Sequence, residues 1–134
     1  MGCLKMNARR LLFPFAVLFL GAGILAAHHS FAAEFDATKP ILLKGRFVKM
    51  DWVNPHTWVH LEVTGEDGKT VVWKAEALPP NGLYRMGWRK DSLTAGEEIS
   101  VQGFMAKDGS HTMWSQSVTK ADGKRMFSGA AQPQ

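Results

Sequence analysis

Histidine is the side chain of this sequence best suited to chemistry, because neutral imidazole binds divalent transition metals. The chain contains His28, His29, His56, His60 and His111. The first two follow directly on a charge-free run that ends at Ala27. If the chain is cleaved after Ala27, the new α-amine and the imidazole of His28 can chelate one metal ion. His29, or a histidine from elsewhere such as His56 or His111, can then add a ligand.

Cleavage one residue earlier also leaves a terminus that suits a metal. A histidine then stands in third place, where the amine, two backbone amides and the imidazole can surround Cu(II) or Ni(II) in a square plane, a geometry typical of these ions. Either cleavage therefore predicts a site for copper or another divalent metal at His28 and His29. The alternative is an exposed polar terminus without a ligand.

Further binding candidates lie in the body of the chain, around an Asn-Pro-His block. Alternation over residues 56–64 places His56, Trp58 and His60 on one face of a strand. The Cα atoms of His56 and His60 are then about 13 Å apart, too far to share one ion easily. We expect His60 to be a structurally satisfied histidine. The ligand-binding candidates are Asn54, Pro55, His56, Trp58 and His111.

The sequence favours binding over catalysis. It contains no Gly-x-Ser-x-Gly block and no phosphate-binding glycine loop. The one cysteine, Cys3, precedes the apolar run and would be removed with it. We expect an accessory protein that binds copper or another divalent metal. The alternatives are a metal-free protein that holds a peptide, protein or small envelope ligand on an aromatic-rich face and, less favoured, a copper-dependent oxidative enzyme.

The N-terminus predicts export. Residues 1–10 carry Lys5, Arg9 and Arg10 and no acid, and residues 11–27 carry no charge. This pattern is typical of a signal peptide over residues 1–27, or of a membrane anchor if it is not cleaved. We therefore expect a bacterial periplasmic or secreted protein that touches a membrane only through this segment, if at all.

The charge of the remaining chain argues against a nucleic-acid partner. The sequence has 16 basic and 12 acidic residues, a net charge of +4. Removal of the three N-terminal cations leaves a body of net charge +1. Binding to phosphates needs several uncompensated cations, so we expect no nucleic acid among the partners.

The pattern of the chain after residue 27 predicts β-strands joined by tight turns. Alternating or apolar runs predict strands over residues 41–52, 56–64, 70–78, 98–106 and 110–119, with a short extra strand at 124–127. Asp-Gly pairs at 67–68, 108–109 and 122–123 predict hairpin turns. A short helix is expected over 82–88, and Gly45 inside the first strand indicates a sharp bend.

This order predicts an all-β fold with one short helix, a small OB-like five-stranded antiparallel barrel, with a β-sandwich as the alternative. The expected organisation is a lead-in segment over residues 28–40, the barrel over 41–127 and a disordered tail over 128–134.

Several short blocks together resemble a known family of small exported bacterial proteins, the domain of unknown function numbered 6152. They are His28-His29-Ser30-Phe31, Glu34-Phe35-Asp36, Trp52-Val53-Asn54-Pro55-His56, Gly87-Trp88 and Asp91-Ser92-Leu93. The resemblance extends from about Ala27 to Phe127. It implies export and a small β-rich domain, and it does not imply a reaction. His28, His29, Asn54, Pro55 and His56 are its motif positions.

Overall fold

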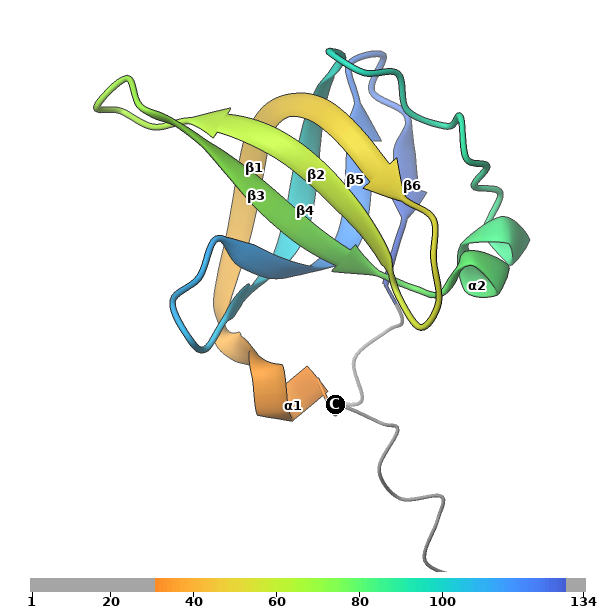
Figure 1. The fold of residues 1–134 in the computed structure, drawn as a ribbon, viewed down its shortest axis with the longest axis horizontal. Coiled ribbons are helices and arrows are strands. Elements are labelled where there is room, and N and C mark those ends of the chain that lie inside the picture. The colour runs from red at the N-terminus through yellow and green to blue at the C-terminus, as the bar shows by residue number, and fades with distance from the viewer. Residues whose placement is uncertain (1–30, 130–134) are drawn as a thin grey trace, which may run out of the picture. The chain divides into compact units, whose positions relative to one another are not determined.

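The computed structural model describes residues 31–129, which form a β-rich domain with two short helices (Figure 1). The all-β fold expected from the alternating pattern is confirmed, and all five long strands and the short sixth one are present. The elements are α1 (Phe31–Glu34), β1 (Phe35–Asp51), β2 (Thr57–Thr64), β3 (Thr70–Ala77), α2 (Pro80–Arg85), β4 (Glu98–Ala106), β5 (Thr112–Lys120) and β6 (Arg125–Phe127). Between Phe31 and Gly129, no helix has the length and apolar character to cross a membrane.

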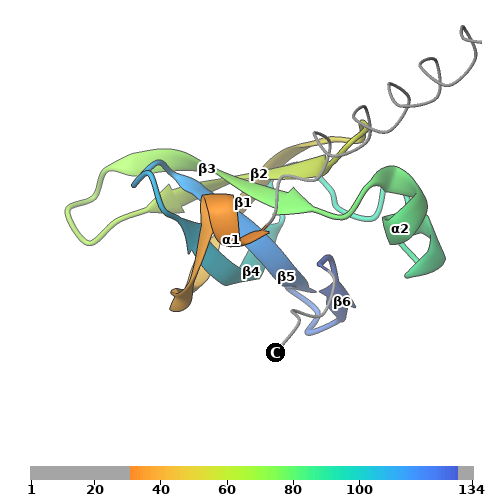
Figure 2. The ribbon, with the colours of Figure 1, turned by 90° about the horizontal axis from the view of Figure 1, so that it is seen from below.

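The first five strands close into a ring. The sheet order is β3-β2-β1-β4-β5-β6, and a further pairing joins β3 to β5 (Figure 2). Neighbours in the sheet are antiparallel, whereas the closing contact between β3 and β5 is parallel. The ring, with α2 between β3 and β4, agrees with the OB-like arrangement expected from the order of elements.

A bend in β1 allows this one strand to pair with β4 along its first part and with β2 along its second part. Arg46 is the point where β1 is paired on both sides, with Glu98 of β4 and Glu62 of β2. A Cβ atom on the preceding residue, Gly45, would overlap the backbone carbonyl of Glu62. The bend predicted at this glycine is therefore a place where two backbones approach too closely for a side chain.

The apolar faces of the strands point into the ring and form the core. Val59, Leu61, Ala75, Val101 and Met113 are fully buried, as alternation requires for residues that share one face of a strand. Val59 and Leu61 thus share the buried face of β2, opposite the face to which alternation assigned His56, Trp58 and His60. The core consists of strand side chains together with Leu83, Trp88 and Leu93 from the connection between β3 and β4.

Helix α2 begins and ends earlier than the predicted span 82–88. Its N-cap is Pro79, and Pro80 occupies the first turn, where its fixed φ suits a helix and its missing N–H costs nothing. Gly87 has a φ of 91°, which ends the helix and turns Trp88 inward.

The described structure begins the first strand earlier than predicted and packs Ser128 into the domain. β1 begins at Phe35, inside the segment 28–40 assigned to a lead-in. Ser128, assigned to the tail, is fully buried, and its hydroxyl lies in hydrogen-bonding contact with that of Ser115. Its carbonyl accepts a hydrogen bond of 2.8 Å from the Leu78 amide.

Candidate functional site

A row of polar and aromatic side chains crosses the outer face of the ring, the face turned away from the core. Trp58 of β2 pairs in register with Asp51 of β1 and with Glu76 of β3. Glu76 pairs with Trp114 of β5, which pairs with Phe104 of β4. Residues opposite each other on paired strands share a face, so these five side chains lie together on one surface.

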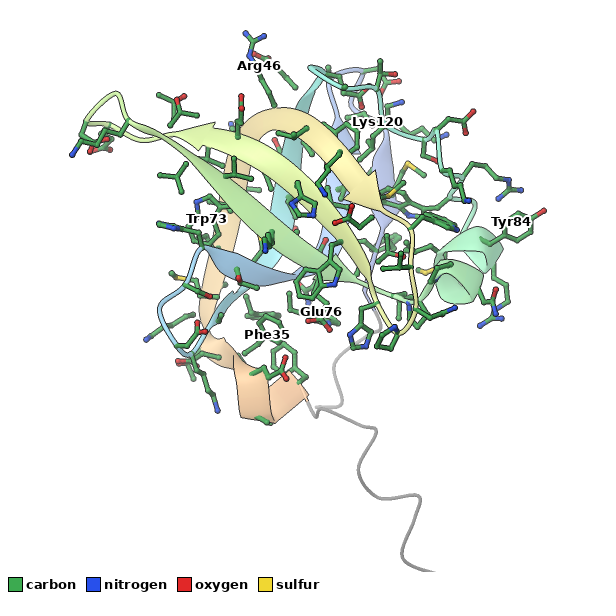
Figure 3. The ribbon with its side chains drawn as sticks, in the orientation of Figure 1. Phe35, Arg46, Trp73, Glu76, Tyr84 and Lys120 are labelled. Carbon is green, nitrogen blue, oxygen red and sulfur yellow. The ribbon has the colours of Figure 1, made fainter. Side chains whose placement is uncertain are left out.

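The carboxylate of Glu76 is buried even though it belongs to the outer face. Its side chain is 8% exposed, and its Oε1 lies 2.7 Å from Nδ1 of His56, whose side chain is 35% exposed. A buried carboxylate needs hydrogen-bond donors. Glu76 therefore fixes the orientation of the imidazole of His56 through its Nδ1 nitrogen. Figure 3 shows Glu76 at the lower edge of the sheet.

A second histidine–carboxylate pair lies on the opposite side of Trp58. Nε2 of His60 lies 2.8 Å from Oδ2 of Asp51, and the His60 side chain is nearly buried. The ammonium of Lys49 donates to both oxygens of the same carboxylate, at 2.9 and 3.2 Å. This arrangement satisfies His60 structurally, as expected. The Lys49 hydrogen bond, followed by that of His60, lowers the pKa of Asp51, while partial burial acts in the opposite direction.

We expect Asp51→Asn to make the fold less sensitive to acid. A carboxyl whose pKa is lower in the folded than in the unfolded chain stabilises the fold above its unfolded pKa, and this contribution disappears as the pH falls through the folded value. Urea unfolding midpoints of the variant should therefore fall less than those of the wild type between pH 7 and about pH 3. Asp91→Asn, in an exposed loop, is the matched control and should follow the wild type. Equal acid sensitivity of all three proteins would contradict the expectation.

Four aromatic rings form a cluster where α1 meets the sheet. The ring centroid of Phe31 lies 5.3 Å from that of Trp114 and 5.7 Å from those of Phe35 and Phe104. Lys107 of the β4–β5 turn also anchors α1, because its amide donates to the Glu34 carbonyl at 2.9 Å and its ammonium to the Ala32 carbonyl at 2.5 Å. These contacts hold α1 against the outer face.

A groove of about 560 Å³ opens beside this cluster. We call it the Trp58 groove. It is lined by Ala33, Glu34, Phe35, Trp58, Ala106, Lys107, Asp108, Ser110 and Thr112. The lining comes from α1 and the start of β1, from the β4–β5 turn, and from Trp58 of β2. The volume is within the range of small-molecule sites.

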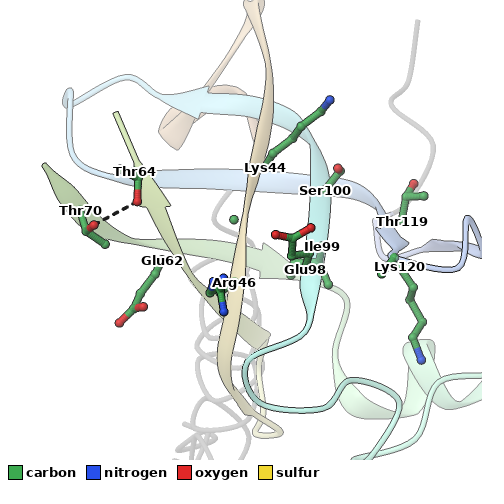
Figure 4. Close-up of a pocket in the computed structure, with 12 residues that line it drawn as sticks. Lys44, Arg46, Glu62, Thr64, Thr70, Glu98, Ile99, Ser100, Thr119 and Lys120 are labelled. Carbon is green, nitrogen blue, oxygen red and sulfur yellow. Dashed lines mark hydrogen bonds between the residues drawn. The ribbon is translucent and has the colours of Figure 1, made fainter. Parts of the chain in front are cut away.

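A second, larger groove of about 690 Å³ lies over the bend of β1 (Figure 4). It contains the cations Lys44, Arg46 and Lys120 and the carboxylates Glu62 and Glu98. Lys120 is engaged elsewhere, since its ammonium donates to the Ser92 carbonyl at 3.0 Å. The charges nearly cancel, so this groove selects no ligand class by its electrostatics.

The structure brings together only some of the metal-binding and ligand-binding residues predicted from the sequence. His28 and His29 lie outside the described residues. Asn54 and Pro55 are exposed and joined by a cis peptide bond in the β1–β2 connection, immediately before His56. Trp58 lines its groove, whereas His111 is in edge contact with Trp73, with ring centroids 5.1 Å apart.

Sequence reasoning missed the roles of Glu76 and Asp51 as partners of the two histidines. The signal was present for Glu76, because the Asp67-Gly68 turn sets a hairpin register that places it opposite Trp58. Within residues 31–129 no group of three or more histidine, cysteine or acidic side chains is arranged to hold a metal ion.

One comparison with known proteins found a match. The model of a family described as "Family of unknown function (DUF6152)" matches residues 17–115. No curated protein and no solved structure matches the chain.

Proposed function

Since the chain belongs to the family of unknown function DUF6152, we propose that it is an exported periplasmic accessory protein that binds copper or another divalent ion through His28 and His29. The observation that carries the proposal is the position of these two imidazoles, directly after a charge-free run of 17 residues over 11–27. Export with cleavage would place them at a free amine.

The chemistry of this terminus supports a metal whichever neighbouring bond is cleaved. A free amine with an adjacent imidazole forms a chelate, and a histidine in third place suits square-planar Cu(II). The domain that follows is well anchored from Phe31 onward, through the aromatic cluster and Lys107. Only Ser30 separates His29 from Phe31.

The test is titration of the exported protein with Cu(II) in a calorimeter, after its intact mass has established the N-terminus. His28→Ala is expected to weaken Cu(II) binding by more than about tenfold, the equivalent of 1.4 kcal/mol. One additional residue before the natural terminus should have a similar effect, because it moves the amine away from the imidazole.

Asp91→Asn is the control, since it removes an exposed carboxylate of the domain and should leave Cu(II) affinity unchanged. An unchanged affinity in His28→Ala, or an equal loss in Asp91→Asn, would show that the terminus is not the site.

A second candidate function is metal-free binding of an envelope ligand on the aromatic-rich face. The Trp58 groove favours it, because a cavity of about 560 Å³ lined by a tryptophan and by both apolar and polar side chains is a suitable ligand site. Binding that persists in EDTA and in His28→Ala would separate this function from the first.

A further inference from the structure

We propose that the Trp58 groove binds a neutral oligosaccharide, an inference that rests on the second candidate function and names its ligand class. A sugar ring presents an apolar face of C–H groups and a rim of hydroxyls. The groove offers complementary chemistry, since its lining includes the indole of Trp58, the carboxylates of Glu34 and Asp108, and the hydroxyls of Ser110 and Thr112.

The walls of the groove are held in place before any ligand arrives. Phe35 pairs in register with Ala106, and both residues line the groove. The amide and the ammonium of Lys107 both donate to carbonyls of α1, at 2.9 and 2.5 Å. Asp108 accepts a hydrogen bond of 2.9 Å from the Ser110 amide within the turn. A preformed site loses little entropy on binding.

The charges of the groove disfavour an anionic ligand. Its charged side chains are Glu34, Asp108 and Lys107. The one ammonium keeps its positive charge while it donates to the Ala32 carbonyl, and two carboxylates against one ammonium give the lining a net negative charge. The Ser110 hydrogen bonds lower the pKa of Asp108, which keeps it ionised at neutral pH. Ionised carboxylates are strong acceptors for hydroxyl donors.

The pairing of the strands disfavours an extended peptide. A peptide that adds to a sheet needs an open strand edge. β2 is paired on both sides, with β1 and β3, and β5 is paired with β4 and, over Thr112–Trp114, with β3. Trp58 is therefore paired on both sides, with Asp51 and Glu76, so an added strand cannot pair with it and recognition by Trp58 must come from its side chain. Among the strand residues of the lining, Phe35 is paired on one side, with Ala106 of β4.

Trp58 has the exposure and the surroundings of a binding platform. It is half-buried, it lies between Asp51 and Glu76 in the cross-strand row, and it shows no ring partner among residues 31–129. Trp114, by contrast, is covered by Phe31. Ser110 and Thr112 add hydroxyls on the β5 side.

The test is titration of the exported protein with chitotetraose, cellotetraose and maltotetraose in EDTA, followed by calorimetry and by NMR of the indole N–H signals. At least one of these sugars should bind and shift the Trp58 indole and the amides of Ser110 and Thr112. Trp58→Ala should reduce the affinity by more than about tenfold, or 1.4 kcal/mol.

Asp108→Asn is the second variant, because asparagine can still accept the Ser110 hydrogen bond and the turn should fold. It should weaken sugar binding several-fold. Asp67→Asn is its matched control, since Asp67 makes the same kind of turn contact, 3.0 Å to the Lys69 amide, in the β2–β3 hairpin outside the groove. That variant should bind as the wild type does.

The outcomes separate this proposal from the metal site. Sugar binding should be unchanged in His28→Ala, and Cu(II) binding should be unchanged in Asp108→Asn. No shift of the Trp58 signals with any of the three sugars would overturn the proposal. Binding of a cationic tetrapeptide such as tetralysine at the same signals, without sugar binding, would also overturn it and assign the groove to cations.

Discussion

Replacement of Trp88 by alanine is expected to lower the free energy of unfolding by about 3–5 kcal/mol, a large part of the stability of a small domain. Trp88 is 0% exposed and is the largest fully buried side chain of the described domain. Its Nε1 donates a 2.8 Å hydrogen bond to the Phe127 carbonyl, which ties the β3–β4 connection to β6. Truncation would leave both a cavity and an unpaired carbonyl.

Two variants separate these contributions in urea unfolding. Trp88→Phe keeps most of the apolar volume but removes the donor, so we expect a smaller loss of about 1–3 kcal/mol. Tyr84→Ala is the matched control in α2, because the Tyr84 side chain is 58% exposed. Its ring is stacked against the Arg89 guanidinium, which lies 3.9 Å from the ring centroid. This substitution should cost about 1 kcal/mol or less. Equal losses in Trp88→Ala and Tyr84→Ala would contradict the buried role of Trp88.

Gly45→Ala is the second substitution from which we expect a large effect, a loss of at least about 1–3 kcal/mol and reduced yield of folded protein. The added Cβ would overlap the Glu62 carbonyl oxygen and lie 3.2 Å from Cγ2 of Val63. The next residue, Arg46, is paired with Glu62 of β2 and with Glu98 of β4. The backbone of β2 therefore cannot move away from Gly45 without breaking its pairing with β1.

Gly65→Ala is the appropriate comparison. A Cβ at Gly65 would meet only the Asp67 carboxylate as its near neighbour, at 3.0 Å, and this exposed side chain can move. We expect a change within about 0.5 kcal/mol. Thermal unfolding of both variants by circular dichroism measures the difference, and a Gly45→Ala protein as stable as Gly65→Ala would show that the close approach at the bend carries no cost.

The inward and outward faces of the strands were predictable from sequence. Alternation over 56–64 separated Val59 and Leu61 from His56, Trp58 and His60, and the first two are fully buried in the core. His56 and Trp58 are half-buried on the other face, whereas His60 is buried there beside Asp51. The Asp-Gly turns were predictable for the same local reason, since Gly68, Gly109 and Gly123 have the positive φ that such turns require. The closing contact between β3 and β5 was not specified by any local pattern.

The fold places the tryptophans in two different environments. Trp73 and Trp88 are core residues, whereas Trp58 and Trp114 belong to the outer face. Trp88 is turned inward by Gly87 and by its bond to Phe127, a partner 39 residues away. No periodicity over the short segment 82–88 distinguishes an inward from an outward indole.

The sequence by itself therefore determined the strand positions, their buried faces and the hairpin turns, because each depends on residues close together in the chain. Only the tertiary structure decided that Glu76 holds His56, that Asp51 satisfies His60, and that Trp58 faces a groove between α1 and the β4–β5 turn. These contacts depend on strand register and on the β3–β5 contact that closes the ring. Both are set by the packing of distant segments, which short-range spacing does not encode.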